Sequence, residues 1–296
     1  MIDFRALETF YWVAELGSFR RTAEKLHTTQ PAISARIAQL EEELATKLIE
    51  RSRPRVGLTP KGIEVLGYAK RLLALRRELM TVVEEKVRVR GALRLGVSET
   101  IVHTWLSELL RRLHREYPLV SPEVVVDISP NLRDSLLRGE LDLAFLLGPI
   151  SAPRVQNIRL CEYPLAWVAS PELKIPRRKL SLSEVVRWPI ITYARGTRPH
   201  AELVERFDRA RCGQARIFAN SSLASIVRMT LDGVGIGVLP VAAVRSWLDR
   251  GDLRRVSVGV KLSSLVFCAA YLDQLDFLLP SIVAEMAKQA ATMEDR

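Results

Sequence analysis

Residues 60–87 place the strongest constraint on how this chain folds. Thr59 and Pro60 form a helix start, a capping residue followed by proline at the first helical position, and only Gly62 and Gly67 interrupt the helix-forming residues that follow. A wide apolar stripe repeats every seven residues, at Leu66, Leu73, Met80 and Val87, flanked by Val65, Leu72 and Leu79. A lone helix of about 40 Å cannot bury such a stripe within itself. We therefore expect it to pair with a second copy of the chain or, alternatively, to pack against the rest of its own chain.

Residues 1–57 predict short helices separated by turn signals. Ser18 follows a glycine and is a good cap for a second helix, and Thr29 caps a third helix whose first turn contains Pro31. The basic stretch 50–57 is broken by proline and glycine, so it cannot continue that third helix. Helix, tight break, helix and basic loop form the outline of a winged helix-turn-helix, a DNA-binding motif.

The second helix of such a pair enters the major groove, so its outward residues are candidates to read base edges. Gln30 suits adenine, Arg36 suits guanine, and Ser34 is permissive. Hydroxyls at helix starts suit phosphate contacts, as do the arginines that alternate along the basic loop, for which the alternative is a solvated surface. The candidate DNA-contacting residues are Ser18, Arg20, Thr28, Thr29, Gln30, Pro31, Ser34, Arg36, Arg51, Arg53 and Arg55.

Beyond residue 90 the pattern predicts strands that alternate with helices. The expected strands are 92–97, 123–128, 141–147, 165–169, 190–193, 216–219 and 235–239, and the expected helices are 104–117, 131–138, 201–211, 223–231 and 277–291. Such alternation implies parallel sheets covered by helices. Two blocks of roughly equal size predict twin α/β lobes with a cleft between them.

Charge and composition narrow the class of protein. Hydrophobic residues make up 48% and charged residues 26% of the chain, as in folded globular proteins. The net charge is +10, and residues 1–90 carry 17 Lys+Arg against 12 Asp+Glu, which favours a polyanionic partner for that part. No apolar run suits a signal peptide or a membrane span, so we expect a soluble, cytoplasmic protein with no membrane partner.

The reactive residue types do not form a catalytic pattern. Cys161, Cys212 and Cys268 include no CxxC pair, which favours a reducing compartment, and a redox switch would need two of them brought together. The histidines show no HExxH spacing and the chain has no GxSxG elbow. Gly233-x-Gly235-x-Gly237 lacks the last glycine of a dinucleotide-binding loop. We therefore expect no enzyme activity, no metal and no cofactor; an enzyme with an appended DNA-binding head is the alternative.

The stretch from Ser18 to Gly62 resembles the LysR-type transcriptional regulators of bacteria. The matching segments are Ser18-Phe19, Ala23-Glu24-Lys25-Leu26-His27, Thr29-Gln30-Pro31-Ala32-Ile33-Ser34-Ala35-Arg36-Ile37, Leu40-Glu41-Glu42-Glu43-Leu44 and Leu58-Thr59-Pro60-Lys61-Gly62. Many members of the family place arginine directly after the serine of the third helix, whereas this chain has Ala35 there and arginine at Arg36. Because helical geometry turns Arg36 by about 100° away from Ala35, we cannot assign it the same base contact, and the preferred base sequence stays open.

The resemblance implies a fold and a set of partners. The fold class is α/β with an N-terminal all-α winged helix-turn-helix (1–58), a long dimerisation helix (59–90) and a two-lobed, Rossmann-like effector domain similar to periplasmic binding proteins. Its first lobe would span 91–162 and 268–296, and its second lobe 163–267. The implied partners are double-stranded DNA with an interrupted palindromic operator, a small-molecule effector, RNA polymerase, and further copies of the chain in a homotetramer built as a dimer of dimers.

In this family the effector lies between the lobes and meets the N-termini of helices. Mapped onto this chain, the candidates are Ser98, Glu99, Thr100, Asn131, Leu147, Gly148, Arg195, Thr197, Arg198, Ser221 and Ser222. Helix N-termini with hydroxyls bind carboxylates, so the expected ligand is a small organic acid or amino acid. Glu99 opposes a simple anion; it favours an amine or points outward. The hydroxyls as mere caps, the arginines as surface charges, and lobes that only oligomerise are the alternatives.

Overall fold

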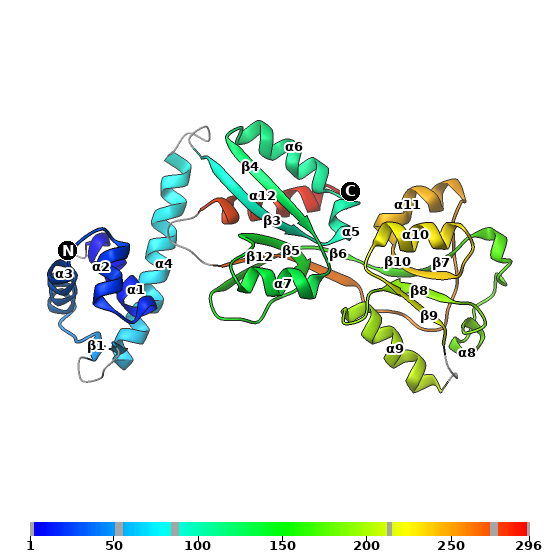
Figure 1. The fold of residues 1–296 in the computed structure, drawn as a ribbon, viewed down its shortest axis with the longest axis horizontal. Coiled ribbons are helices and arrows are strands. Elements are labelled where there is room, and N and C mark those ends of the chain that lie inside the picture. The colour runs from blue at the N-terminus through cyan, green and yellow to red at the C-terminus, as the bar shows by residue number, and fades with distance from the viewer. Residues whose placement is uncertain (1–2, 51–55, 84–88, 212–214, 273–277, 295–296) are drawn as a thin grey trace. The chain divides into compact units, whose positions relative to one another are not determined.

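The computed structural model describes residues 3–50, 56–83, 89–211, 215–272 and 278–294. The chain divides into two compact units, residues 1–85 and residues 86–296, whose elements are labelled in Figure 1. Three candidate DNA contacts, Arg51, Arg53 and Arg55, lie outside the described residues, and so does Cys212. Within the described ranges no helix has an apolar stretch long enough to cross a membrane.

The first unit is a set of capped helices followed by a two-stranded wing. Its elements are α1 (Phe4–Leu16), α2 (Phe19–Lys25), α3 (Gln30–Glu43), β1 (Ile49–Glu50), β2 (Gly57–Leu58) and α4 (Pro60–Val83). The predicted caps are confirmed: the Ser18 hydroxyl accepts the N–H of Arg21, and the Thr29 hydroxyl accepts the N–H of Ala32. Gly17 ends α1 in the left-handed region, which favours glycine. β1 and β2 pair antiparallel.

The core of this unit joins α1 to α3 and to the start of α4. Phe10 and Val13 of α1 are fully buried against Ile33 and Ile37 of α3. The Thr59 hydroxyl donates to the carbonyl of Lys47 (2.7 Å) and accepts the N–H of Gly62 (2.9 Å), so the cap of α4 is tied to the segment before β1. A Cβ atom at Gly62 would lie 2.1 Å from the carbonyl oxygen of Leu48. Only glycine allows α4 to begin this close to the wing.

Helix α4 has two apolar faces, and its own chain covers one of them. Ala69 and Leu73 are buried, and Lys70 pairs with Glu15 of α1 at 2.8 Å. Packing against its own chain therefore accounts for this face. Four large apolar side chains on another face are exposed and are spaced by four, three and four residues: Tyr68, Leu72, Leu75 and Leu79. We refer to these four residues as the exposed seam.

The second unit contains two five-stranded sheets. The first sheet, in lobe I, has the order β4-β3-β5-β12-β6, with β3 (Gly91–Val97), β4 (Val120–Val126), β5 (Leu143–Leu147), β6 (Val155–Tyr163) and β12 (Leu265–Leu272). One face is covered by α6 (Leu106–Glu116) and α12 (Leu279–Glu294), and the other by α7 (Ser129–Leu137). A short helix, α5 (Glu99–Val102), follows β3 directly.

The second sheet, in lobe II, has the order β11-β7-β10-β8-β9. Its strands are β7 (Leu165–Ala169), β8 (Ile190–Tyr193), β9 (Ile217–Asn220), β10 (Ile236–Pro240) and β11 (Arg254–Arg255). α8 (Leu182–Val185) and α9 (Arg198–Ala210) pack on one face, α10 (Leu223–Leu231) and α11 (Val241–Arg250) on the other, and a 3-10 turn spans Pro171–Leu173.

The expected α/β class is confirmed, but the expectation of parallel sheets is wrong in part. β3 pairs in parallel with β4 and β5, and β8 pairs in parallel with β9 and β10. β12, however, runs antiparallel to both β5 and β6, and β7 runs antiparallel to β10. The reason is the chain path: it leaves lobe I through β6 into β7 and returns through β12, so all of lobe II is inserted between two neighbouring strands.

One buried carboxylate holds the wing against α3. Glu41 is 4% exposed and accepts the Leu48 N–H at 2.9 Å, the Ile49 N–H at 3.2 Å and the Lys47 ammonium at 2.7 Å. Burial alone raises the pKa of Glu41, but the hydrogen bonds from Lys47, Leu48 and Ile49 outweigh it, so its pKa lies below its ordinary value.

We predict that Glu41→Gln lowers the free energy of unfolding at pH 7 by about 2 kcal/mol, because the amide cannot accept all of these bonds. A lowered pKa means that the carboxylate stabilises the fold above its ordinary pKa of 4.5 and loses this effect as the pH falls through the folded-state value. Chemical denaturation of wild type and variant should therefore converge at low pH. Glu42→Gln, one position along and exposed, is the control and should change little.

Candidate functional site

The candidate DNA contacts of the first unit gather around the start of α3. Gln30, Pro31 and Ala35 are exposed on this helix, while Ser34 and Arg36 are half-buried. Ile33 and Ile37 face the core and fix the rotation of the helix. The outward face therefore presents an amide at its first turn and a small residue at position 35, a surface that a duplex groove can approach closely.

The other candidates lie where α2 and α3 begin. Ser18 and Thr29 are the N-caps of α2 and α3, so the remaining free backbone N–H groups of those first turns lie beside them. Thr28 donates its N–H to the Ala23 carbonyl at 2.9 Å, which fixes the turn between the helices. Arg20 is exposed and pairs with Glu24 at 3.2 Å. Hydroxyls, helix N-termini and an exposed guanidinium are groups that contact phosphate.

In the second unit a small cavity lies between the carboxyl ends of β3 and β5 and the strands and helices of lobe II. Its volume is about 40 Å³, and we refer to it as the cleft cavity. The candidates that line it are Ser98, Glu99, Thr100, Leu147, Thr197 and Ser221. The Ser98 hydroxyl lies 3.1 Å from that of Ser129, which also accepts the N–H of Leu147 at 3.0 Å. This series of bonds ties β3, α7 and β5 together at the cleft.

Glu99 and Thr100, at the start of α5, make hydrogen bonds from lobe I to lobe II. The Glu99 carboxylate accepts the Ser222 hydroxyl at 3.2 Å, the Ala224 N–H at 3.1 Å and the Leu223 N–H, all at the start of α10. The Thr100 hydroxyl lies 3.4 Å from that of Tyr193, whose pKa is raised by burial. Glu99 therefore neither repels a ligand from an open site nor points outward: it points across the cleft at a helix N-terminus.

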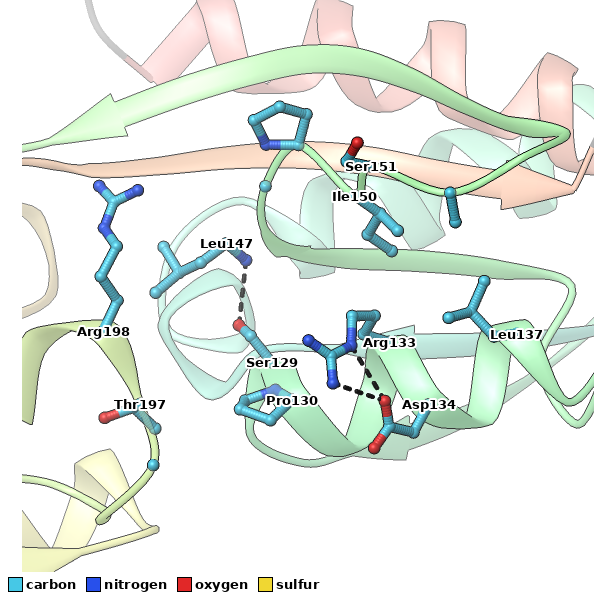
Figure 2. A pocket seen from close by; sticks show the side chains of 14 residues that line it. Ser129, Pro130, Arg133, Asp134, Leu137, Leu147, Ile150, Ser151, Thr197 and Arg198 are labelled. Atoms are coloured by element: carbon cyan, nitrogen blue, oxygen red, sulfur yellow. Dashed lines mark hydrogen bonds and ion pairs between the residues drawn. The ribbon is translucent and has the colours of Figure 1, made fainter. Parts of the chain in front are cut away.

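A larger cavity of about 600 Å³ adjoins the cleft cavity; we refer to it as the large cavity. Ser129, Leu147 and Thr197 line both. Figure 2 shows that Arg133 and Asp134 approach it from α7, whereas Thr197 and Arg198 approach it from the start of α9. Arg133 pairs with Asp134 at 2.8 Å, and Arg198 donates to the Ser264 carbonyl at 3.1 Å.

The charge at the large cavity is positive overall. Two guanidinium groups stand against one carboxylate, and the N-termini of α7 and α9 add partial positive charge. The candidates Leu147, Gly148, Thr197 and Arg198 all line this cavity. Its volume is within the range that holds a small organic ligand.

Some candidates lie apart from both cavities, and several lining residues were not anticipated. Asn131 donates to Asp127 at 3.0 Å, Arg195 is exposed, and Ser222 reaches the cleft through Glu99. The lining residues that sequence reasoning missed are Asp127, Ile128, Ser129, Pro130, Arg133, Asp134, Leu137, Pro149, Ile150, Ser151, Ala152, Tyr193, Gly196, Pro199, Leu223, Leu265 and Phe267. A signal for Ser129 was present: Ser-Pro after a strand is a typical helix start.

The two described cysteines do not face each other. Cys161 lies in the core beneath α6 and α12, whereas Cys268 lies on the opposite face of β12, where a Cβ at Gly148 would be 2.9 Å from its own Cβ. Burial raises the pKa of the Cys268 thiol, which disfavours the reactive thiolate. Among the described residues no group of three or more His, Cys, Asp or Glu side chains could hold a metal ion.

Comparison with known protein families accounts for both units. The sequence profile described as bacterial regulatory helix-turn-helix protein, lysR family, matches residues 4–63. The profile described as LysR substrate binding domain matches residues 87–276. The chain belongs to the LysR family. It is a DNA-binding transcriptional regulator with an effector-binding domain, and the enzyme alternative is set aside because its relatives are named as regulators.

This LysR-type regulator resembles known proteins along most of its length. It is 29% identical to the HTH-type transcriptional regulator YofA of Bacillus velezensis, over 83% of this chain and 84% of that protein. It shares its fold with LysG of Corynebacterium glutamicum, solved with the effector Arg bound (TM-score 0.57, 15% identity, 99% of each chain). It also shares its fold with CbnR, solved with its target DNA (TM-score 0.51, 20% identity, 98% of this chain and 100% of that one).

We predict that Gln30→Ala relaxes the base preference of this regulator at one operator position. The amide is exposed at the start of α3, and loss of one bidentate base contact removes about 1–3 kcal/mol of discrimination. Arg20→Ala should instead weaken binding to all sequences alike and lower the salt dependence by about one phosphate contact. Filter binding to a set of operator variants over a salt series measures both. An equal effect of Gln30→Ala on every sequence would refute its role in base reading.

Proposed function

We propose that this regulator senses a small carboxylate in the large cavity and transmits its binding to the DNA-binding unit. The single observation that carries the proposal is the cavity of about 600 Å³ lined by Arg133, Arg198 and the N-termini of two helices. An arginine can grip a carboxylate with two parallel hydrogen bonds, and a helix N-terminus supplies further N–H donors. Organic acids and amino acids both carry such a group.

The ligand acts by a shift of population between lobe arrangements. The large cavity is lined by α7 of lobe I and by the start of α9 of lobe II, so a ligand that binds both favours one arrangement over others. The DNA-binding units of an oligomer would change their spacing in response, and with it the bending of DNA and the access of RNA polymerase. The regulator would act in this way in the cytoplasm, where its operator is accessible.

A second copy of the chain is the partner that we assign to the exposed seam. Tyr68, Leu72, Leu75 and Leu79 are spaced by four, three and four residues, the spacing at which two helices pack along their length. A dimer formed in this way carries two copies of α3 and would bind an interrupted palindrome. We further propose that two dimers associate into a tetramer, as is usual in this family.

The effector proposal predicts a loss of ligand response when the guanidinium at the cavity is removed. In a thermal-shift screen against amino acids, including arginine, and aliphatic and aromatic carboxylates, at least one compound should stabilise the wild type. Arg198→Ala should weaken its binding about tenfold or more, since a charged hydrogen bond is lost. Arg209→Ala, on the same helix but away from the cavity, is the control. If no compound raises the Tm of the wild type, the alternative that the lobes only oligomerise is favoured.

The dimer proposal predicts that Leu75→Glu produces monomers and weakens DNA binding sharply. A charge buried at a helix pair is strongly destabilising to the pair. Ile63→Glu is a matched control, since Ile63 is 63% exposed and Leu75 62%, but Ile63 lies on another side of α4. Analytical ultracentrifugation of both variants distinguishes the two positions. A Leu75→Glu protein that remains dimeric would contradict the assignment of the seam.

A further inference from the structure

Glu99 is the only acidic residue of α5, and it is bound to the other lobe. It is the first residue of that helix, directly after the N-cap Ser98, which follows β3. Its carboxylate accepts hydrogen bonds from Ser222, Leu223 and Ala224, which begin α10. The His103 side chain lies 3.6 Å from the same carboxylate, which is 21% exposed.

These donors are the ones that a helix N-terminus offers to an anion. The first N–H groups of a helix have no partner within the helix, and the helix dipole favours negative charge beside them. α10 is nine residues long, and its cap Ser222 adds a hydroxyl that donates to Glu99 while it accepts the Ser225 N–H. A carboxylate of the chain itself therefore fills the position where a ligand carboxylate would be received.

The small volume of the cleft cavity is consistent with Glu99 filling the position in front of α10. The cleft cavity, which Glu99 and Leu223 both line, has a volume of about 40 Å³. That volume has room for water but not for an organic acid, whose pockets are typically several hundred cubic ångströms. Glu99 does not line the large cavity. The two cavities thus differ in what they can receive.

We propose that Glu99 is an internal ligand of this regulator. It joins lobe I to α10 of lobe II, and it excludes carboxylate ligands from that helix N-terminus. Glu99 is then a specificity-determining residue, since it restricts effector carboxylates to the large cavity. The contact between Thr100 and Tyr193 at 3.4 Å lies beside it and supports the same arrangement of the lobes. The role in specificity rests on the proposed function of the large cavity, whereas the contact between Glu99 and α10 does not.

The test is rescue of Glu99→Ala by acetate in the full-length protein. Alanine removes two carbons and the two oxygens of the carboxylate, and acetate carries the same set of non-hydrogen atoms. We expect Glu99→Ala to lower the Tm by about 2–4 °C. Sodium acetate at constant ionic strength should restore the Tm in a saturable way, at a concentration at least tenfold below any effect on the wild type.

Matched variants make each outcome decisive. Glu108→Ala, which removes an exposed partner of Arg111 on α6, should show no acetate response. Glu99→Gln should lower the Tm, because an amide cannot accept hydrogen bonds from every one of these donors. It should not respond to acetate, because the glutamine side chain fills the same volume. A Glu99→Ala protein with no acetate response, or a Glu99→Gln protein as stable as wild type, would overturn the proposal.

The double variant Glu99→Ala with Arg198→Ala separates this inference from the effector proposal. Arg198 lines the large cavity and not the cleft cavity. The acetate response should therefore persist in the double variant, even if no effector is ever found for the large cavity. Loss of the acetate response on removal of Arg198 would place acetate in the large cavity and refute the internal-ligand assignment.

Discussion

Strand β12 is the element on which the effector-binding unit depends. It pairs with β5 on one side and β6 on the other, and both partners precede it by more than a hundred residues. Phe267 and Ala269 face the core beneath α6 and α12, whereas Ala270 faces the cluster beneath α7. Because lobe II is inserted between β6 and β12, the first sheet is complete only after the chain has returned from the second. The position of lobe II is thus tied to the core of lobe I.

Local signals in the sequence were sufficient for the helices of the first unit and insufficient for the sheets of the second. Ser18 and Thr29 cap α2 and α3 as predicted, since a cap needs only its own first turn. β6 was missed because Gln156, Asn157 and Arg159 interrupt its apolar residues, as is usual in an edge strand. β12 was missed as well, although Leu265–Leu272 is a nearly unbroken apolar run. Its direction is decided by partners far away in the chain, and no local pattern encodes that direction.

The candidate ligand site shows the same division. The sequence located hydroxyls and helix starts on both sides of the cleft, because they follow strands in a regular order. It did not reveal that Glu99 reaches Ser222, since a contact across 123 residues depends on how two lobes face each other. For the same reason Arg133, in the interior of α7, carried no sign that it would stand at a cavity.

The wall common to both cavities has a thermodynamic consequence. Ser129, Leu147 and Thr197 separate the small space at Glu99 from the larger one at Arg198. A molecule that binds in one cavity and moves these three residues would change the free energy of binding in the other cavity. By linkage this effect is reciprocal. If an effector in the large cavity weakens the hydrogen bonds between Glu99 and α10 by some factor, then loss of those bonds changes the affinity for that effector by the same factor. Coupling between the two cavities would then pass through the residues that line both of them.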